Sequence, residues 1–213
     1  MKHLSVPYIH IGETSAIGEI SSKLDDVHQE IIHNSPWTAF PYKPEVAFAM
    51  AHGDNGVFLK FFVEEKYLRA IYSEPNQPVY KDSCVEFFVS FGDEREYYNF
   101  EFNCAGTCLL SFGNERTNRE MTSSELIRSI AFQSSIKPAT NRDANVGWEL
   151  TVAIPFAAFQ YHQVNSMKGK KCRANFYKCG DDLPEPHFLA WNTIQTEEPD
   201  FHRPEFFGTV EFN

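Results

Sequence analysis

Two strand-like runs joined by a short polar turn constrain the fold of this chain more than any other feature. The runs are Cys84–Phe91 and Tyr97–Asn103, and the turn between them reads Gly-Asp-Glu-Arg. Both runs are rich in aromatic and β-branched residues, which are typical of strands. Polar and large apolar side chains alternate along each run. Because a strand directs alternate side chains to opposite faces, the pattern predicts two neighbouring strands of one sheet.

The alternation predicts a row of polar side chains on one face of this sheet. Glu86 in the first run and Glu101 and Asn103 in the second are expected to point off the same face, away from Phe100 and its aromatic neighbours. Carboxylates and amides beside aromatic rings suit a sugar-binding surface. The same two carboxylates would also suit a glycosidase, so the row alone leaves both classes open.

The composition indicates a folded chain with a substantial core. Hydrophobic residues make up 42% and aromatic residues 15% of 213 residues, which is enough for one sizeable domain, and we expect a single domain over residues 1–213. The formal net charge of -10 argues against nucleic acid or an anionic membrane as the partner. No apolar run approaches the roughly 20 residues that a membrane-spanning helix needs.

The N-terminus and the cysteines bear on the cellular location. The first residues, MKHLSVPYIHIGETS, contain no apolar stretch of a signal peptide, which predicts a cytoplasmic location unless a leader has been removed. The 5 cysteines cannot all pair within one chain, and their apolar surroundings predict reduced, buried thiols. Neither feature indicates an oligomeric state.

Short β-runs separated by Gly, Pro and Asn predict an all-β fold, an antiparallel, jelly-roll-like β-sandwich with a few short helical turns. The predicted strands are Glu45–Ala51, Val57–Glu64, Arg69–Ser73, Ser83–Phe91, Tyr97–Cys104, Thr107–Phe112, Ile130–Lys137, Gly147–Ile154, Lys171–Lys178, Leu189–Asn192 and Thr209–Phe212. A short helix is expected at Thr14–Leu24 and a single helical turn at Pro155–Phe159. Thr122–Arg128 fits a helical turn or a loop, and Val27–His33 fits a helix or a strand. The long polar segment Gly180–Pro204 is expected to be a functional loop.

Four motifs, in order along the chain, resemble family 9 carbohydrate-binding modules, in particular a stand-alone bacterial type. They are the two strand runs within Tyr80–Thr107, GWELTVAIPFAAF at Gly147–Phe159, RANFYKCGD at Arg173–Asp181, and FHRPEFFGTVEF at Phe201–Phe212. The resemblance extends from about Trp37 to the C-terminus. It implies an antiparallel β-sandwich that binds sugars at chain ends, held between two aromatic rings, in carbohydrate catabolism and polysaccharide utilisation and often beside glycoside hydrolases.

The resemblance also implies roles for individual residues. By position, Tyr80 matches the first clamp aromatic, although the family often has Trp there, and Glu86 matches the carboxylate that bonds sugar hydroxyls. Glu101 and Asn103 fall in the polar row on the next strand, and Trp191 is the candidate second clamp. Arg116 is added from its own chemistry, because a guanidinium fork in a polar loop suits vicinal hydroxyls or a uronate. The predicted ligand-binding residues are therefore Tyr80, Glu86, Glu101, Asn103, Arg116 and Trp191.

The sequence favours binding over catalysis. It shows no GxSxG, HExxH or phosphate-binding glycine loop, and we assign no catalytic residue and no metal ligand. No cofactor is expected with confidence; the resemblance leaves a structural calcium ion possible, with no ligand set found. The predicted function is non-catalytic carbohydrate binding. The alternatives are a glycoside hydrolase with Glu86 and Glu101 as its carboxylate pair, and a lipocalin-like or haem-binding β-sandwich, for which no axial His/Met pair is evident.

Overall fold

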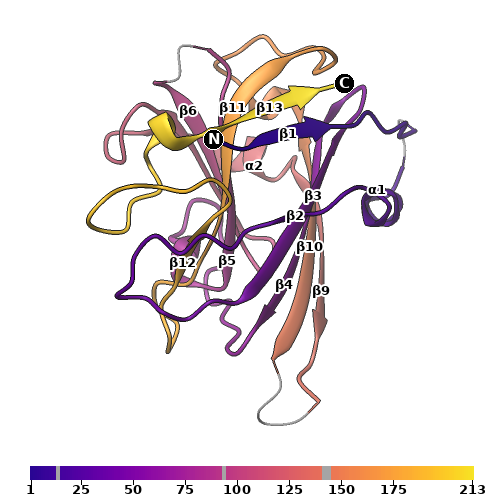
Figure 1. The fold of residues 1–213 in the computed structure, drawn as a ribbon. Helices are drawn as coiled ribbons and strands as arrows, with labels where there is room; N and C mark the ends of the chain where they lie inside the picture. The colour runs from indigo at the N-terminus through magenta and orange to yellow at the C-terminus, as the bar shows by residue number, and fades with distance from the viewer. Residues whose placement is uncertain (13–14, 93–94, 141–144) are drawn as a thin grey trace.

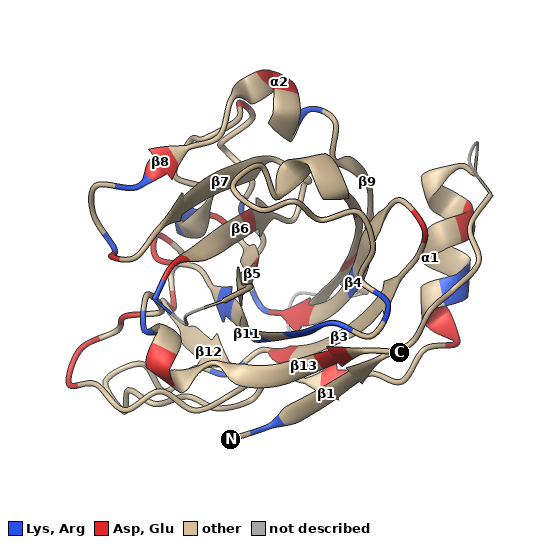
Figure 2. Ribbon diagram, turned by 90° about the horizontal axis from the view of Figure 1, so that it is seen from above, with Lys and Arg blue, Asp and Glu red and all other residues tan. Residues whose placement is uncertain are grey.

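The computed structural model consists of two β-sheets packed face to face (Figure 1), and it describes residues 1–12, 15–92, 95–140 and 145–213. The larger sheet has the strand order β1 (His3–Val6), β13 (Gly208–Phe212), β11 (Lys171–Cys179), β5 (Cys84–Ser90), β6 (Tyr97–Asn103), β7 (Cys108–Gly113) and β8 (Glu120–Met121), and β12 (Phe188–Ala190) also pairs with β11. The smaller sheet has the order β2 (Glu30–Ile31), β3 (Glu45–His52), β4 (Gly56–Glu65), β10 (Val146–Pro155) and β9 (Ala131–Lys137). Viewed from above, the two sheets curve around a common interior (Figure 2).

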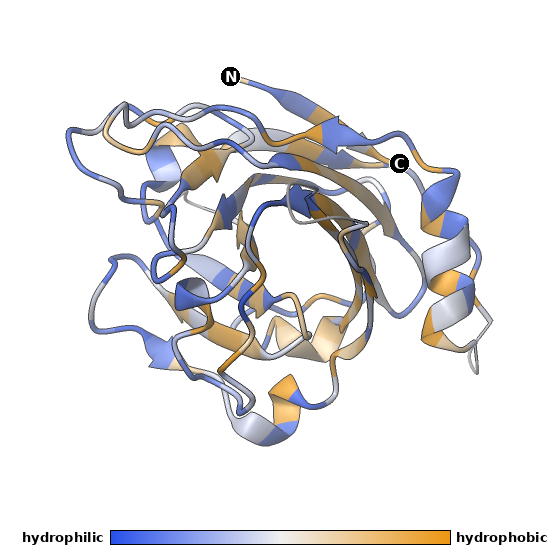
Figure 3. Cartoon of the chain, turned by 90° about the horizontal axis from the view of Figure 1, so that it is seen from below, coloured by the Kyte–Doolittle hydropathy of each residue, from blue (hydrophilic) through white to orange (hydrophobic). Residues whose placement is uncertain are grey.

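The interior between the sheets is the main hydrophobic core. Val85 and Phe87 of β5 and Phe100 of β6 face inward, as their alternation predicts. The aromatic rings carry much of the contact across the sandwich, since Phe48 of β3 stacks on Phe176 of β11 with ring centroids 3.8 Å apart. Hydrophobic and hydrophilic residues alternate along the strands when coloured by hydropathy (Figure 3). These inward-facing rows fix which side chains must point out of the sandwich.

The outer faces of both sheets are partly covered as well. Helix α1 (Ile17–Asp25) lies on the outer face of the smaller sheet, where Ile20 and Leu24 pack against Phe58. On the outer face of the larger sheet, Phe88 and Tyr177 belong to a second aromatic cluster. The cluster is closed by side chains from the C-terminal loop and from the segment before β3, namely Trp37, Phe201 and Phe207. Aromatic side chains therefore cover much of the outer face of the larger sheet.

The strand predictions are confirmed except at one segment. Residues Arg69–Ser73, predicted as a strand, do not form one. Their backbone donors are used locally instead, because the N–H groups of Ile71 and Tyr72 both donate to the buried carboxylate of Asp82, each at 3.0 Å. The short edge strands β1 and β8 were not predicted, since two to four residues carry too little alternation to be recognised.

The helical predictions are confirmed in outline. The first predicted helix is α1; residue 14, where the prediction begins, lies outside the described part of the chain. Helix α2 (Ser124–Ile127) and a 3-10 turn at Phe156–Ala158 fall inside the other predicted turns. The ambiguous Val27–His33 contains β2. Among the described helices, none has the length and apolarity to cross a membrane.

Candidate functional site

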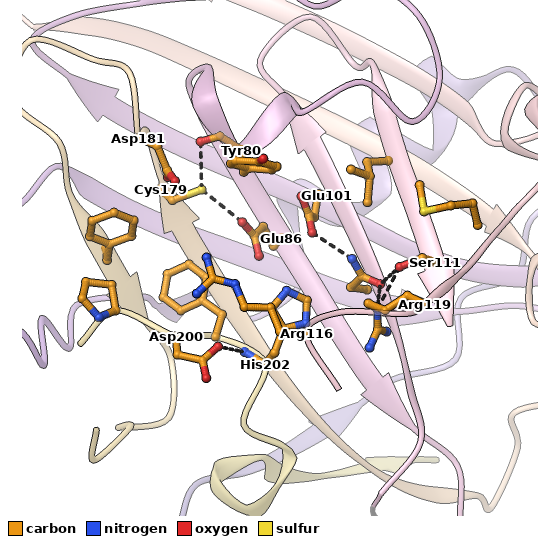
Figure 4. A pocket seen from close by; sticks show the side chains of 16 residues that line it. Tyr80, Glu86, Glu101, Ser111, Arg116, Arg119, Cys179, Asp181, Asp200 and His202 are labelled. Carbon is orange, nitrogen blue, oxygen red and sulfur yellow. Dashed lines mark hydrogen bonds between the residues drawn. The ribbon is translucent and has the colours of Figure 1, made fainter. Parts of the chain in front are cut away.

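A cavity of about 330 Å³ opens on the outer face of the larger sheet (Figure 4). Its floor is built by polar side chains of three adjacent strands, namely Glu86 on β5, Asn99 and Glu101 on β6, and Ser111 on β7. Its walls come from the segment that contains Tyr80 and from the loops that follow β7, β11 and β12. Segments far apart in the sequence thus meet at one site.

Strand register brings the two glutamates together. Glu86 and Glu101 are direct partners in the antiparallel pairing of β5 with β6. Each stands between inward-facing core residues, so its own side chain must point to the outer face. Both side chains are buried, with only 3% of Glu86 and 4% of Glu101 exposed. The prediction that these carboxylates share one face is confirmed.

A hydrogen-bond network fixes the carboxylates of the floor. Asn99 Nδ2 donates to Glu101 Oε1 at 2.8 Å, and the Cys179 thiol donates to Glu86 Oε1 at 3.0 Å. Arg119 Nε in turn donates to Asn99 Oδ1 at 3.0 Å and to Ser111 Oγ at 2.9 Å, which orients the amide. Glu101 Oε2 is different, because it is buried and has no hydrogen-bond partner among the described residues. Glu101 Oε2 therefore keeps hydrogen-bonding capacity that the described residues do not use.

Burial and mutual repulsion raise the pKa values of the acidic groups. The pKa of Glu86 lies well above its usual range because the group is desolvated and Glu101 is close. Burial raises the pKa of Glu101 to about 7, although the Asn99 hydrogen bond and Arg119 oppose the shift. Burial likewise raises the pKa of Asp181 to about 6, with Arg116 opposing it. The site therefore holds three carboxyl groups that resist full ionisation near neutral pH.

Aromatic side chains stand on two sides of these carboxylates. In the close view, Tyr80 lies on one side of Glu86, and His202 and Arg116 lie on the other (Figure 4). Burial lowers the pKa of His202 to about 3, so its ring is neutral, and its Nδ1 shares a hydrogen bond of 2.9 Å with the Tyr97 hydroxyl. Phe201 also lines the cavity from the same loop as His202. The cavity thus combines ring faces with carboxylate oxygens.

Four of the predicted ligand-binding residues line this cavity: Tyr80, Glu86, Glu101 and Arg116. Trp191 does not, which corrects the expectation that it forms the second wall. Its side chain has no exposed surface, it packs edge-on against Phe48 and Phe176 in the core, and its Nε1 donates to Glu30 Oε2 at 2.9 Å. A side chain with no exposed surface cannot stack on a sugar.

Asn103 is the second correction. It shares a strand face with Glu101, but it lies at the end of β6 and outside the cavity lining. Its Oδ1 accepts hydrogen bonds from the backbone N–H groups of Ala105 and Thr107, and its Nδ2 donates to the Asp82 carboxylate at 2.9 Å. Its Oδ1 thus holds the turn after β6 and its Nδ2 holds the segment 72–82, so both polar atoms have partners within the protein.

The cavity also contains residues that the sequence did not single out as ligand contacts. They are chiefly Asp181, Phe188, Asp200, Phe201 and His202. All lie in or beside the segment Gly180–Pro204, which was predicted to be a functional loop from its length and polarity. The loop was recognisable, but the side chains within it that face the sheet depend on how it folds back.

Trp37 and Trp148 are buried in the core, as expected.

One cluster of potential metal ligands occurs among the described residues. Cys84, Glu86 and Cys179 offer ligand atoms within 4.8 Å of one another, and all three are buried. Calcium takes oxygen ligands, so two thiols and one carboxylate do not fit it. The structural calcium ion that the resemblance left possible therefore stays a prediction. All five cysteines are unpaired and buried, as expected for small apolar side chains in a core.

The fold and the site define the class of this protein as a carbohydrate-binding β-sandwich. Residues 20–212 match the model of carbohydrate-binding family 9, and the chain belongs to that family. The glycoside hydrolase alternative gains no support from this match. The search of curated proteins finds no match to the chain.

Solved structures agree with this assignment. A candidate carbohydrate-binding protein from Bacteroides uniformis shares 40% identity over 100% of this chain and 99% of its own, with a TM-score of 0.92. A family 9 carbohydrate-binding module from Caldicellulosiruptor kristjanssonii in complex with glucose has 16% identity over 100% of this chain and 96% of its own, with a TM-score of 0.60. A second structure from that organism, with cellotriose, covers 99% of this chain and 93% of its own at 16% identity and a TM-score of 0.56. The two distant structures show the shared β-sandwich fold.

Proposed function

We propose that the cavity above Glu86 and Glu101 is the site at which this protein binds carbohydrate, without acting on it chemically. One observation carries the proposal: the unpartnered buried oxygen of Glu101 and the ring of Tyr80 line the same cavity. A carboxylate oxygen accepts hydrogen bonds from sugar hydroxyls. An aromatic face packs against the C–H face of a pyranose, and a cavity with a few placed polar groups is typical of small-molecule sites.

The geometry suggests that the ligand is the end of a chain or a short oligosaccharide. The volume of about 330 Å³ lies at the lower end of the range for ligand pockets, roughly 300–1,000 Å³. Tyr80 forms one wall, and we assign the opposite wall to Phe201 and His202 in place of Trp191. Arg116 is exposed at the mouth and can bond to hydroxyl groups that remain outside. A site with few contacts predicts micromolar to millimolar affinity, about −4 to −8 kcal/mol.

The chemistry of the two glutamates also favours binding over hydrolysis. A retaining glycosidase needs one carboxyl group with a raised pKa as the acid and one that stays ionised as the nucleophile. Here burial raises the pKa of both Glu86 and Glu101. Both groups are therefore better suited to hydrogen bonding with hydroxyls than to divided catalytic roles.

Isothermal titration calorimetry tests the proposal. Glucose and cellotriose are the first probes because solved neighbours contain them, followed by a panel of other mono- and oligosaccharides. We expect wild-type protein to bind at least one sugar, and Tyr80→Ala and Glu86→Gln to weaken that binding at least about tenfold, equal to about 1.4 kcal/mol. Calorimetry is preferred to tryptophan fluorescence, since the three tryptophans are buried and none lines the cavity.

The matched controls are Tyr67→Ala and Glu125→Gln. Both side chains are exposed and lie outside the cavity lining. These variants should bind the sugar as wild type does. The proposal fails if no sugar in the panel binds, or if Tyr80→Ala, shown by circular dichroism to be folded, binds as tightly as wild type. Release of sugar products from the oligosaccharides would instead favour the hydrolase.

A further inference from the structure

We propose that this cavity prefers a sugar carrying a protonated amino group over the neutral and acidic forms of the same sugar. The inference rests on the proposed function, because it names the class of ligand for that same site. The basis for the inference is an excess of carboxyl groups in the cavity. The protein's own cations do not balance this excess. The buried, unpartnered oxygen of Glu101 supplies the point at which an ammonium group would bind.

Carboxyl groups outnumber guanidinium groups in the lining. The acidic residues are Glu86, Glu101, Asp181 and Asp200, and the basic residues are Arg116 and Arg119. Lysine does not line the cavity in the described part of the chain. The lining therefore carries a net negative charge when its acidic groups are ionised.

Arg119 does little to neutralise these carboxylates directly. Its Nη1 donates to the Glu115 carbonyl at 2.7 Å, and its Nη2 donates to the Tyr97 carbonyl at 2.8 Å. Its Nε is shared between Asn99 and Ser111. These partners are neutral groups, so the guanidinium holds the floor in shape and acts on Glu101 only from a distance.

Other nearby cations are directed to a different carboxylate. Lys81 Nζ lies 3.7 Å from Asp182 Oδ2, and Arg69 Nη2 lies 3.5 Å from the same oxygen. Asp181, the neighbour that lines the cavity, has no ion pair with any residue that the structure describes. Among the described residues that line the cavity, Arg116 is the remaining cation, and its side chain is exposed.

A protonated amine matches this environment in charge and in hydrogen bonding. An ammonium group donates up to three hydrogen bonds, and bonds between charged groups are roughly twice as strong as neutral ones. Burial is the main cause of the raised pKa values of Glu86, Glu101 and Asp181, and nearby carboxylates add to it; a ligand cation would offset this repulsion. A uronate would instead add another negative charge to the cavity, which the site should reject.

The experiment compares sugars that differ in a single substituent. Glucose, glucosamine, N-acetylglucosamine and glucuronate are titrated into the protein by calorimetry, and galactose, galactosamine and N-acetylgalactosamine form a second series. At about pH 7 the amino sugars are largely cationic, because an α-amino group titrates near 7.7–8.0. We expect the amino member of the series that binds to have an affinity at least about tenfold higher than its neutral and N-acetyl counterparts.

Variants show whether the carboxylates cause the preference. In Glu101→Gln and Asp181→Asn, which keep the shape and remove a charge, the ratio of amino-sugar to neutral-sugar affinity should fall toward one. Arg116→Met should increase the ratio, because it removes a competing cation. Glu125→Gln, an exposed substitution on α2, should leave the ratio unchanged.

The outcomes separate this inference from the proposed function. If a neutral sugar binds and the amino form binds no better, the preference for amines is wrong while carbohydrate binding stands. The inference is also overturned if the folded Glu101→Gln and Asp181→Asn variants both keep the full ratio. If no member of either series binds, and no sugar of the wider panel binds, both proposals fail together.

Discussion

Glu86 on β5 and Glu101 on β6 face each other as register partners, and both carboxyl groups are almost completely buried in the floor of the cavity. Two like charges in this position cannot both ionise without a large cost in free energy. This pair is therefore the first place to test the proposed binding site.

The first prediction concerns stability and pH. Burial raises the pKa of Glu101 from its usual 4.5 to about 7, so the folded state holds its proton more tightly than the unfolded state. The contribution of Glu101 to stability is fully present below pH 4.5 and is lost as the pH rises through about 7. Glu101→Gln cannot ionise. As the pH rises from about 5 to about 8, the free energy of unfolding of Glu101→Gln minus that of wild type should increase by on the order of 2 kcal/mol.

Urea denaturation of both proteins at several pH values measures this difference. Glu125→Gln is the matched control, because its exposed carboxylate should not couple to folding. An offset between wild type and Glu101→Gln that does not change with pH would show that Glu101 is ionised normally in the folded protein.

The second prediction concerns a buried ion pair that joins the two sheets. Lys178 Nζ on β11 lies 3.0 Å from Glu65 Oε2 on β4, and neither side chain has exposed surface. Trp148 Nε1 donates to the other oxygen of Glu65 at 2.6 Å. Lys178→Met leaves Glu65 buried without its cation and should lower the free energy of unfolding by about 3–5 kcal/mol.

Chemical denaturation at neutral pH tests this expectation. The double variant Lys178→Met with Glu65→Gln should recover part of the loss, because no buried charge is then left unpaired. Lys66→Met, which breaks the exposed pair with Glu185, should cost less than about 1 kcal/mol. Equal effects of the two lysine substitutions would mean that the buried pair is not formed as described.

The third prediction separates the two roles considered for Trp191. Because its ring is buried against Phe48 and Phe176, Trp191→Ala should lower the free energy of unfolding by about 3–5 kcal/mol. Trp191→Phe should keep most of the stability and all of the sugar affinity. Denaturation and calorimetry together measure both quantities. If a folded Trp191→Phe variant has lost sugar binding, Trp191 contributes to the binding site and this prediction is wrong.

The fourth prediction contrasts the two arginines of the cavity. Arg119 donates to Asn99, Ser111 and two backbone carbonyls, and lysine cannot reproduce that planar fork, so Arg119→Lys should cost about 1–3 kcal/mol of stability. Arg116 has no hydrogen bond to other described residues, so Arg116→Lys should change stability by less than about 0.5 kcal/mol. Thermal unfolding distinguishes these cases. If Arg116→Lys is the more destabilising change, the assignment of Arg119 as the structural arginine is wrong.

Local patterns in the sequence were sufficient for most of the fold. Alternation in 84–90 and 97–103 identified two strands and the face that carries Glu86 and Glu101, because side-chain direction in a strand depends only on position along it. The same reasoning failed at Arg69–Ser73. There the buried carboxylate of Asp82 takes up the backbone donors that a neighbouring strand would have used.

The sequence by itself determined the β-sandwich and the strand face that carries Glu86 and Glu101, since those depend on short-range periodicity, whereas Tyr80 was assigned from the family resemblance. Only the tertiary structure decided the opposite wall. Trp191 and His202 both follow β11 in polar-looking sequence, yet Trp191 turns into the core against Phe176 and His202 lines the cavity. The direction of each side chain is set by the path of the loop over the sheet and by partners distant in the chain, such as Glu30 and Tyr97. Contacts of that range leave no periodic signal in the sequence.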